Sequence, residues 1–290
     1  MKKVIYSLAA VALVAGIATS CNKQDDEVAN EPFKFDVVEL TDGSATVAVT
    51  PDSLGKTYFT LCGTKDEYNT IIDSLGEAGL IEYQYEYVIS YIAYLAKLGY
   101  NRDFSYFATV GKDTLALGPG LDPQTEYVAA AFYLDSLGNN DGKIYIHNFT
   151  TKAVEQSNVE LKIASDGDTL FHITLSDENQ LYIYYAELAD TIAVYGAETY
   201  LQNYVDMIVG NRASNYQFIV HSGNEDVSID DLLVWNSGKY QLIAAPFTEG
   251  AHICGKAVSY DFEYAGASYS PALAPAEKVL NHDKIHRIRK

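Results

Sequence analysis

The sequence predicts a mainly β protein with two tandem β-sandwich domains, each with inserted helices. Three observations support this fold class. Apolar and polar residues alternate on both sides of Asp-Gly turns, the pattern occurs twice, and a helical stretch follows the third predicted strand of each copy. The chain has 290 residues, 48% of them hydrophobic, which is enough for two cores. A repeat of this length indicates a duplicated domain rather than a solenoid.

The first copy begins with FKFDVVELTDGSATVAVTP (residues 33–51), whose alternation around Asp42-Gly43 predicts a β-hairpin. A third strand is expected at residues 57–62. The helical pattern then runs over residues 65–98, and we expect two helices with a break near Gly76 and Gly79, because glycine interrupts helices.

The second copy repeats these elements in the same order. ELKIASDGDTLFHITLS has Asp166-Gly167 where the first copy has Asp42-Gly43, and a third strand is expected at residues 181–185. Apolar residues at helical spacing then predict a single helix over residues 194–209. The copies end alike, with GKIYIHNF (142–149) and GKAVSYDF (255–262), and we expect the boundary between them in the polar stretch near AVEQSN.

The segment LDPQTEY (residues 121–127) resembles the end of the fibronectin type III pattern, in which Leu, Pro, Thr and Tyr precede an apolar strand. The resemblance implies a tyrosine corner at Tyr127, whose hydroxyl would bond to the backbone of the preceding turn. It implies the same role for Tyr240, although VWNSGKY lacks the Pro and the Thr. Both copies also contain helices that ordinary type III domains lack, so the resemblance covers about half of each copy.

The first 20 residues form a predicted export signal. Two lysines precede an apolar run that is too short and too rich in small residues to be a membrane span. The run ends in IATSC (residues 17–21), which resembles the lipobox of bacterial lipoproteins. The resemblance implies that Cys21 is lipidated and anchors the chain in the outer membrane. The alternative is an ordinary secretory signal with an incidental Cys21.

An acidic cluster follows at Asp25, Asp26 and Glu27, within a polar tether that ends at residue 32. The cluster resembles the export signal of Bacteroidetes surface lipoproteins, which implies display on the outer face of the outer membrane. A merely solvated linker is the alternative. The whole layout looks like Bacteroidetes surface lipoproteins with tandem fibronectin type III or immunoglobulin-like domains.

The tetrapeptide DSLG occurs three times, at residues 52–55, 73–76 and 135–138. Asp, Ser and Gly suit turns, and the second occurrence is expected to end a helix. In addition, Leu or Ile follows every Asp-Ser and Asp-Thr pair. This pattern resembles the O-glycosylation acceptor of exported Bacteroidetes proteins, whereas the alternative is a favoured turn reused by duplication. The residues implied as acceptors are Ser53, Ser74, Thr114, Ser136, Thr169 and Thr191.

No residue spacing in the sequence predicts a catalytic site, a metal site or a cofactor. Cys62 and Cys254 lie in apolar strands and are expected to be buried free thiols. The feature most suggestive of binding is a helical stripe at i, i+4 and i+7, formed by Tyr87, Tyr91 and Tyr94. These rings are candidate ligand contacts, unless they only widen the stripe that packs on the sandwich.

The formal net charge of −19 disfavours nucleic acid and anionic lipid headgroups as partners. We therefore expect a non-catalytic surface lipoprotein that is held in the membrane by its lipid anchor and binds a protein or glycan. A structural or assembly subunit of an envelope complex is the alternative, and an enzyme or enzyme inhibitor has the least support. The predicted organisation is a signal peptide at 1–20, an acidic tether at 21–32, domains at 33–153 and 158–267, and a tail at 268–290.

Overall fold

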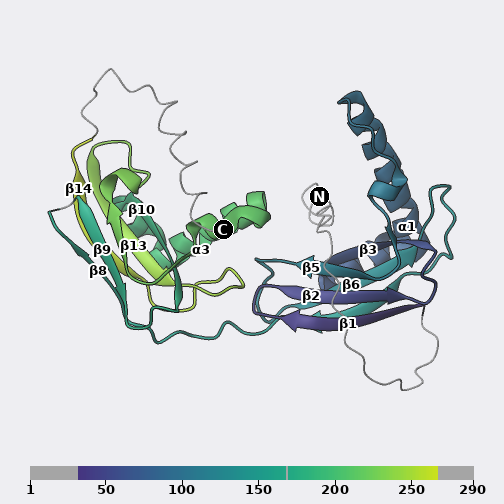
Figure 1. Ribbon diagram of the computed structural model, residues 1–290, viewed down its shortest axis with the longest axis horizontal. Coiled ribbons are helices and arrows are strands. Elements are labelled where there is room, and N and C mark those ends of the chain that lie inside the picture. Colours follow the sequence, from purple (N-terminus) through teal and green to yellow (C-terminus); the bar gives the residue numbers. More distant parts are fainter. Residues whose placement is uncertain (1–31, 168, 267–290) are drawn as a thin grey trace, which may run out of the picture.

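The computed structural model describes residues 32–167 and 169–266, which form two β-sandwiches in tandem (Figure 1). Cys21, Asp25, Asp26 and Glu27, together with the tail at 268–290, lie outside the described residues. The mainly β architecture with helical insertions is the one that the sequence predicted.

Seven strands form the first sandwich. One sheet has the order β1-β2-β5, and the other has the order β4-β3-β6-β7, with every pair antiparallel. Two antiparallel sheets of this kind form the β-sandwich that the sequence predicted. The bounds are β1 Phe33–Leu40, β2 Ala45–Pro51, β3 Thr57–Thr64, β4 Thr109–Val110, β5 Asp113–Leu117, β6 Glu126–Tyr133 and β7 Tyr145–Thr150.

The central strand β6 explains how a helix fits onto this sandwich. Its residues are buried on both faces of the sheet. Tyr127, Ala129 and Ala131 face the three-stranded sheet, whereas Val128, Ala130 and Phe132 pack in the cluster that includes residues of α1 (Lys65–Lys97). The four-stranded sheet therefore has an apolar outer face, and α1 covers it.

The long helix α1 begins at a capping box. The hydroxyl of Thr64 accepts from the backbone of Glu67, and the Glu67 carboxylate accepts from the backbone of Thr64. The helix is broken at Gly76, where φ is 68° and ψ is 170°, so the predicted interruption in this region is confirmed. The short helix η2 (Phe104–Tyr106) follows and packs Phe104 against the same cluster.

The second sandwich repeats the topology of the first. Its sheets have the orders β12-β9-β8 and β11-β10-β13-β14. As in the first domain, the helices connect the third strand to the short strand that pairs with its edge. The bounds are β8 Leu161–Ser165, β9 Leu170–Leu175, β10 Leu181–Leu188, β11 His221–Ser222, β12 Glu225–Ser228, β13 Gly238–Pro246 and β14 Val258–Tyr264, with a short helix η4 at Ile229–Asp231.

The helical insertion of the second domain differs from the single helix predicted over residues 194–209. It consists of α2 (Ala189–Tyr195), α3 (Ala197–Arg212) and η3 (Ala213–Ile219). The break lies at Gly196, where φ is 79° and ψ is 149°. This conformation ends α2 and allows both helices to pack on the sheet, with Ile192 from α2 and Leu201 from α3 in one core cluster.

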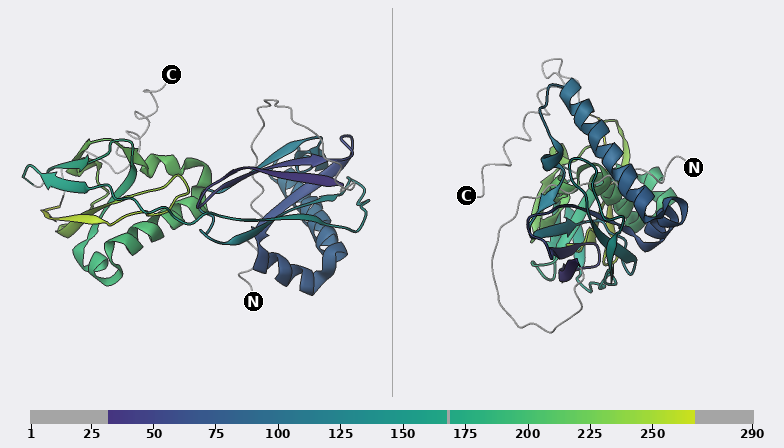
Figure 2. Two further views of the ribbon diagram at one scale, coloured as in Figure 1. Left: turned by 90° about the horizontal axis from the view of Figure 1, so that it is seen from below. Right: turned by 90° about the vertical axis from the view of Figure 1, so that its right-hand side faces the viewer.

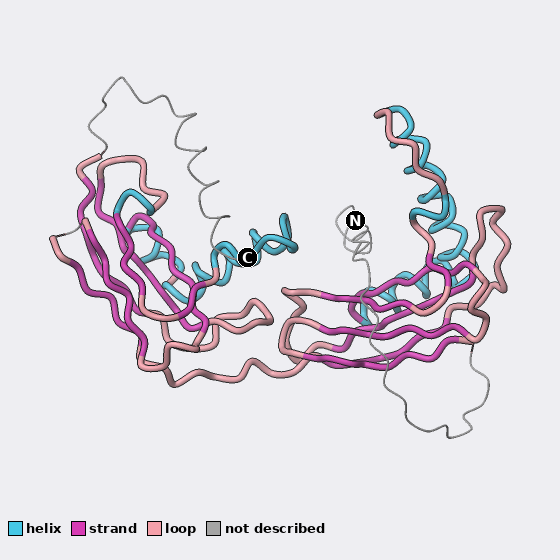
Figure 3. The backbone as a smooth tube through the Cα atoms, in the orientation of Figure 1, coloured by secondary structure: helices cyan, strands magenta, loops and turns pink. Residues whose placement is uncertain are grey.

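The helices of both domains lie on the same side of the tandem pair (Figures 2 and 3). Among the described residues, no helix has both the length and the apolar character needed to cross a membrane.

Candidate functional site

The three predicted contact tyrosines lie together on the outer face of α1. The exposed fractions of Tyr87, Tyr91 and Tyr94 are 36%, 38% and 53%. Adjacent ring centroids are 6.0 Å apart in both pairs, with interplanar angles of 8° and 30°. These rings form a continuous aromatic surface that reaches solvent, which we call the tyrosine surface.

The other face of α1 holds the helix against the sheet. Ile81 and Val88 are fully buried there, and Ile92 packs partly buried against the same cluster. Because one face is fixed in the core, the tyrosines on the other face are carried on a rigid element.

Residues after α1 extend the tyrosine surface, and the sequence analysis missed them. The Phe107 ring meets the Tyr91 ring edge to face at 5.8 Å, and Tyr106 meets Phe107 at 5.0 Å. The guanidinium of Arg102 lies 4.4 Å from the centre of the Tyr106 ring. The recognisable signal in the sequence is Asp103, whose carboxylate accepts from the Ser105 N–H and caps η2 just before these rings.

A groove of about 550 Å³ lies at the end of the first domain, between the β2–β3 and β6–β7 loops. In it the ammonium group of Lys56 lies 4.7 Å above the Tyr133 ring, and the Tyr133 hydroxyl donates to Asp52 at 2.5 Å. Burial, followed by this bond, raises the pKa of Tyr133 to about 12, and the same bond is the main cause that lowers the pKa of Asp52. The polar side chains of Tyr133 and Asp52 in the groove are therefore already hydrogen-bonded to each other.

Two of the three DSLG segments form turns beside this groove. At residues 135–138 the Asp135 carboxylate accepts from the backbone N–H groups of Leu137 and Asn139, and Gly138 has φ 83°. In the turn at residues 52–55, the Lys56 N–H donates a hydrogen bond to the Ser53 carbonyl. The third segment, residues 73–76, ends the first part of α1 at Gly76, as the sequence predicted.

The predicted O-glycosylation residues differ in exposure. Ser74, Thr114, Ser136 and Thr169 are exposed, whereas Ser53 and Thr191 are half-buried. Ser53 and Ser136 belong to loops on the same groove. The remaining four lie on α1, on β5, beside β9 and in α2.

The two predicted corner tyrosines bond to nearby backbone. The Tyr127 hydroxyl accepts from the Asp122 N–H at 2.8 Å, and the Tyr240 hydroxyl donates to the Asn236 carbonyl at 3.0 Å. Both side chains are buried, so each bond satisfies a polar atom inside a core and ties a turn to the following strand.

The described residues contain no group of three or more His, Cys, Asp and Glu side chains that could hold a metal ion. Cys62 and Cys254 are free thiols, the first half-buried and the second buried. Burial raises the pKa of Cys62 to about 12 and also raises the pKa of Cys254, so both stay in the weakly reactive thiol form near neutral pH.

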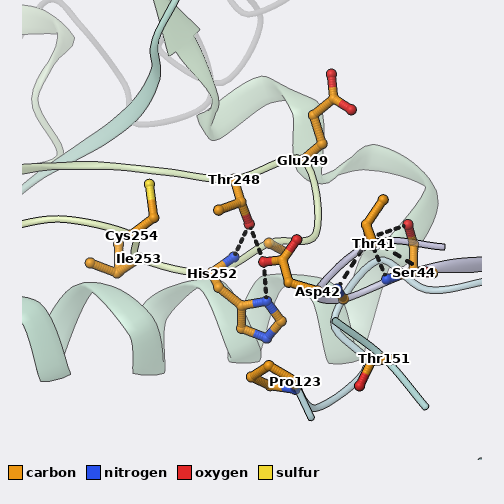
Figure 4. A network of polar contacts seen from close by, with 12 residues as sticks. Thr41, Asp42, Ser44, Pro123, Thr151, Thr248, Glu249, His252, Ile253 and Cys254 are labelled. Atoms are coloured by element: carbon orange, nitrogen blue, oxygen red, sulfur yellow. Dashed lines mark hydrogen bonds and ion pairs between the residues drawn. The ribbon is translucent and has the colours of Figure 1, made fainter. Parts of the chain in front are cut away.

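A polar cluster joins the two domains (Figure 4). Asp42, in the β1–β2 turn, accepts from the Thr248 hydroxyl at 2.6 Å and lies 3.0 Å from Nδ1 of His252. The Gly120 N–H donates to the Gly250 carbonyl at 3.2 Å. The side chains of Asp42 and His252 are only 11% and 13% exposed, so the cluster is nearly closed to solvent.

The segment that connects the domains is held at both of its ends. Lys152 N donates to the Thr41 carbonyl in the first domain, and Ser157 N donates to the Cys254 carbonyl in the second. With the polar cluster, these bonds form the interdomain joint.

None of the protein-family models and none of the curated proteins compared with the sequence matches it. Solved structures do align with it along most of the chain, and the three described next all contain fibronectin type III domains. The FN1-FN3 domains of chicken CNTN1 are 11% identical over 80% of this chain and 66% of that chain (TM-score 0.23). A two-domain segment of chicken tenascin is 8% identical over 80% and 98% (TM-score 0.22), and the central array of RIM-binding protein is 9% identical over 82% and 65% (TM-score 0.19).

Proposed function

We propose that the protein is a non-catalytic cell-surface lipoprotein that binds a protein or glycan ligand through the tyrosine surface of α1. The observation that carries this proposal is the exposure of Tyr87, Tyr91 and Tyr94 as one group of rings on a helix whose other face is buried. A tyrosine ring offers a large apolar face with a polar tip, at a small cost in side-chain entropy. Such rings are enriched in protein interfaces, and they also stack on sugars.

The anchoring half of the proposal rests on the sequence alone. A lipid on Cys21 would hold the chain in the outer membrane, and Asp25, Asp26 and Glu27 would direct it to the outer face. Protease treatment of intact cells tests this display, with a periplasmic protein as the control. Loss of the protein while the control survives is the expected result, and retention of both in cells would count against outward display.

Binding is tested with a triple variant, Tyr87→Ala, Tyr91→Ala and Tyr94→Ala, on arrays of glycans and of extracellular proteins. The matched control is Tyr195→Ala, which removes a ring that is 55% exposed in the second domain. Truncation of one hot-spot ring typically costs about 2 kcal/mol or more, so we expect binding to weaken at least ~30-fold in the triple variant and to stay unchanged in the control. Equal binding by all three proteins would reject this surface.

We also propose O-glycosylation at one or more of Ser53, Ser74, Thr114, Ser136, Thr169 and Thr191. The exposed members of the set present a hydroxyl to solvent, which a transferase requires. The intact mass of the native protein tests the proposal. A mass equal to that of the lipidated polypeptide alone would refute it.

A further inference from the structure

We propose that the first domain docks on the lipid bilayer through three exposed leucines, Leu54, Leu75 and Leu137, which we call the leucine tip. Each is the third residue of a DSLG segment. This inference rests on the proposed lipid anchor at Cys21 and adds a second contact between the protein and its membrane. It requires that Ser53, Ser74 and Ser136, which directly precede the leucines, carry no glycan, so it confines the proposed O-glycosylation to Thr114, Thr169 and Thr191.

All three leucines are exposed to solvent. The exposed fractions are 55% for Leu54, 49% for Leu75 and 80% for Leu137. Exposed apolar residues that recur at one end of a domain indicate a contact surface, whereas scattered ones need no explanation.

The turn chemistry of the DSLG segments explains how leucine comes to lie at the apex. In the β6–β7 loop, the Asp135 carboxylate accepts from the Leu137 N–H at 2.8 Å and from the Asn139 N–H at 3.0 Å. In the β2–β3 loop, Asp52 accepts from the hydroxyl of Tyr133. Both carboxylates are thus engaged within the domain, while the leucines that follow them remain exposed.

Contacts between the loops and α1 bring the three leucines to the same end of the domain. The β2–β3 and β6–β7 loops line the same groove. The Tyr85 hydroxyl lies 3.4 Å from the Ser136 carbonyl, and the Glu77 carboxylate accepts from Ile144 N at 3.0 Å. Leu75 lies two residues before Glu77, next to the break in α1 at Gly76, so it belongs to this end as well.

The position of Pro32 identifies the bilayer as the occupant. Pro32 lines the same groove, so the chain that follows Cys21 enters the domain at the leucine tip. Residues 21–31 span at most about 3.5 Å each, or about 40 Å in all, so the tip cannot lie farther than this from the lipid that holds Cys21. A tether of this length makes docking effectively intramolecular. The opposite end of the domain holds the interdomain joint and is closed to the membrane.

The charges beside the tip select the kind of lipid. Asp52, Asp73, Asp135 and Asp141 lie in or next to the DSLG segments and their loops, and they outnumber the lysines there, Lys56 and Lys143. Their charge opposes an anionic surface, and the opposition weakens with added salt. We therefore expect docking on zwitterionic headgroups, with the leucine side chains entering the interface between headgroups and acyl chains.

The test uses the lipidated full chain in phosphatidylcholine vesicles that contain a lipid-borne quencher. An environment-sensitive dye is placed at Leu137→Cys, and in a control protein at Val194→Cys, which is 76% exposed in the second domain. Cys254 is buried, and the half-buried Cys62 is replaced by Ala in every labelled protein. We expect the emission of the dye at position 137 to shift to the blue and to be quenched, and the dye at position 194 to show neither effect. Both effects at position 137 should weaken when anionic lipid replaces part of the phosphatidylcholine.

The outcomes separate failure of the anchor from failure of docking. Protein that does not float with the vesicles lacks the lipid anchor, which removes the basis of the inference. Protein that floats while the dye at position 137 behaves like the dye at position 194 overturns docking and leaves the anchor intact. A blue shift on native cells without quenching in vesicles would assign the tip to a protein contact and would also overturn docking.

A second variant keeps the inference testable if the dye perturbs the loop. The substitutions Leu54→Ser, Leu75→Ser and Leu137→Ser leave the hydrogen bonds of the turns in place, so the domain should fold normally by circular dichroism. With dye at Ser136→Cys, which is also exposed, we expect the triple variant to lose the quenching that the parent shows. Equal quenching in both proteins would show that the leucines are not what enters the lipid.

Discussion

Oδ2 of Asp42 lies 3.0 Å from Nδ1 of His252, although these residues belong to different domains and are separated by most of the chain. The contact is nearly closed to solvent, and the same carboxylate oxygen also accepts from Thr248. A charge-assisted bond in such surroundings is stronger than one at an exposed surface. The two sandwiches therefore meet directly at a small set of buried polar groups, which holds them in the bent arrangement of this structure.

We predict that Gly43→Ala opens the interdomain joint. A Cβ at Gly43 would lie 1.8 Å from the backbone oxygen of Gly250, and the backbone cannot move aside as a flexible side chain could. Overpacking of this kind typically costs about 1–3 kcal/mol. Small-angle scattering should show a larger radius of gyration for the variant, while circular dichroism stays unchanged because each sandwich keeps its own core.

The matched control for this experiment is Gly55→Ala, because a Cβ there meets nothing within 4 Å. It should scatter like the parent protein. A Gly43→Ala protein with the parent radius of gyration would mean that the joint adjusts without opening.

A second prediction concerns the bend in α1. Gly76 has φ 68° and ψ 170°, a region that is essentially accessible to glycine alone, and a Cβ there meets nothing within 4 Å. The cost of Gly76→Ala is therefore conformational rather than steric. We expect Gly76→Ala to lower the free energy of unfolding, measured by urea denaturation, by about 1–3 kcal/mol. Gly55→Ala should leave this free energy unchanged. No loss of stability would mean that the two parts of α1 can join into one straight helix.

The sequence predicted the strands better than the helices and the joint. The hairpin around Asp42-Gly43 follows from alternation with a period of two, and Val47 and Val49 are fully buried as that pattern requires. The single helix over residues 194–209 was wrong, because the apolar spacing continues across Gly196 while the backbone does not. The joint was missed because Asp42 is explained locally as a turn residue, and its partners lie in the distant β13–β14 loop.

The tyrosine stripe was recognisable from spacing, but its exposure was not. Residues at i, i+4 and i+7 share a helix face whether that face is buried or solvated. Which face packs on the sheet depends on how α1 leaves β3 and on the bend at Gly76, and these are tertiary features.

A third prediction concerns pH. His172 lies between Asp226, 2.6 Å from Nδ1, and Asp166, 3.2 Å from Nε2. The hydrogen bond to Asp226, followed by that to Asp166, raises the pKa of His172 above its ordinary value of 6.5. The stabilisation is therefore complete below the unfolded-state pKa and is lost as pH rises through the folded-state pKa. Melting temperatures from about pH 6 to about pH 8 should fall more steeply in the parent than in His172→Gln. Identical slopes would show that the pair of carboxylates does not stabilise the charged ring.

The last prediction separates the two faces of α1. Ile81 is fully buried between the helix and the sheet, and Ile81→Ala should lower the free energy of unfolding by about 2–5 kcal/mol through lost burial and a cavity. Tyr94 is 53% exposed, so Tyr94→Ala should change it by no more than about 0.5 kcal/mol. Urea denaturation of the two variants measures both values. Should Tyr94→Ala prove as costly as Ile81→Ala, the ring would belong to the core, and the tyrosine surface would lose the exposure on which ligand binding depends.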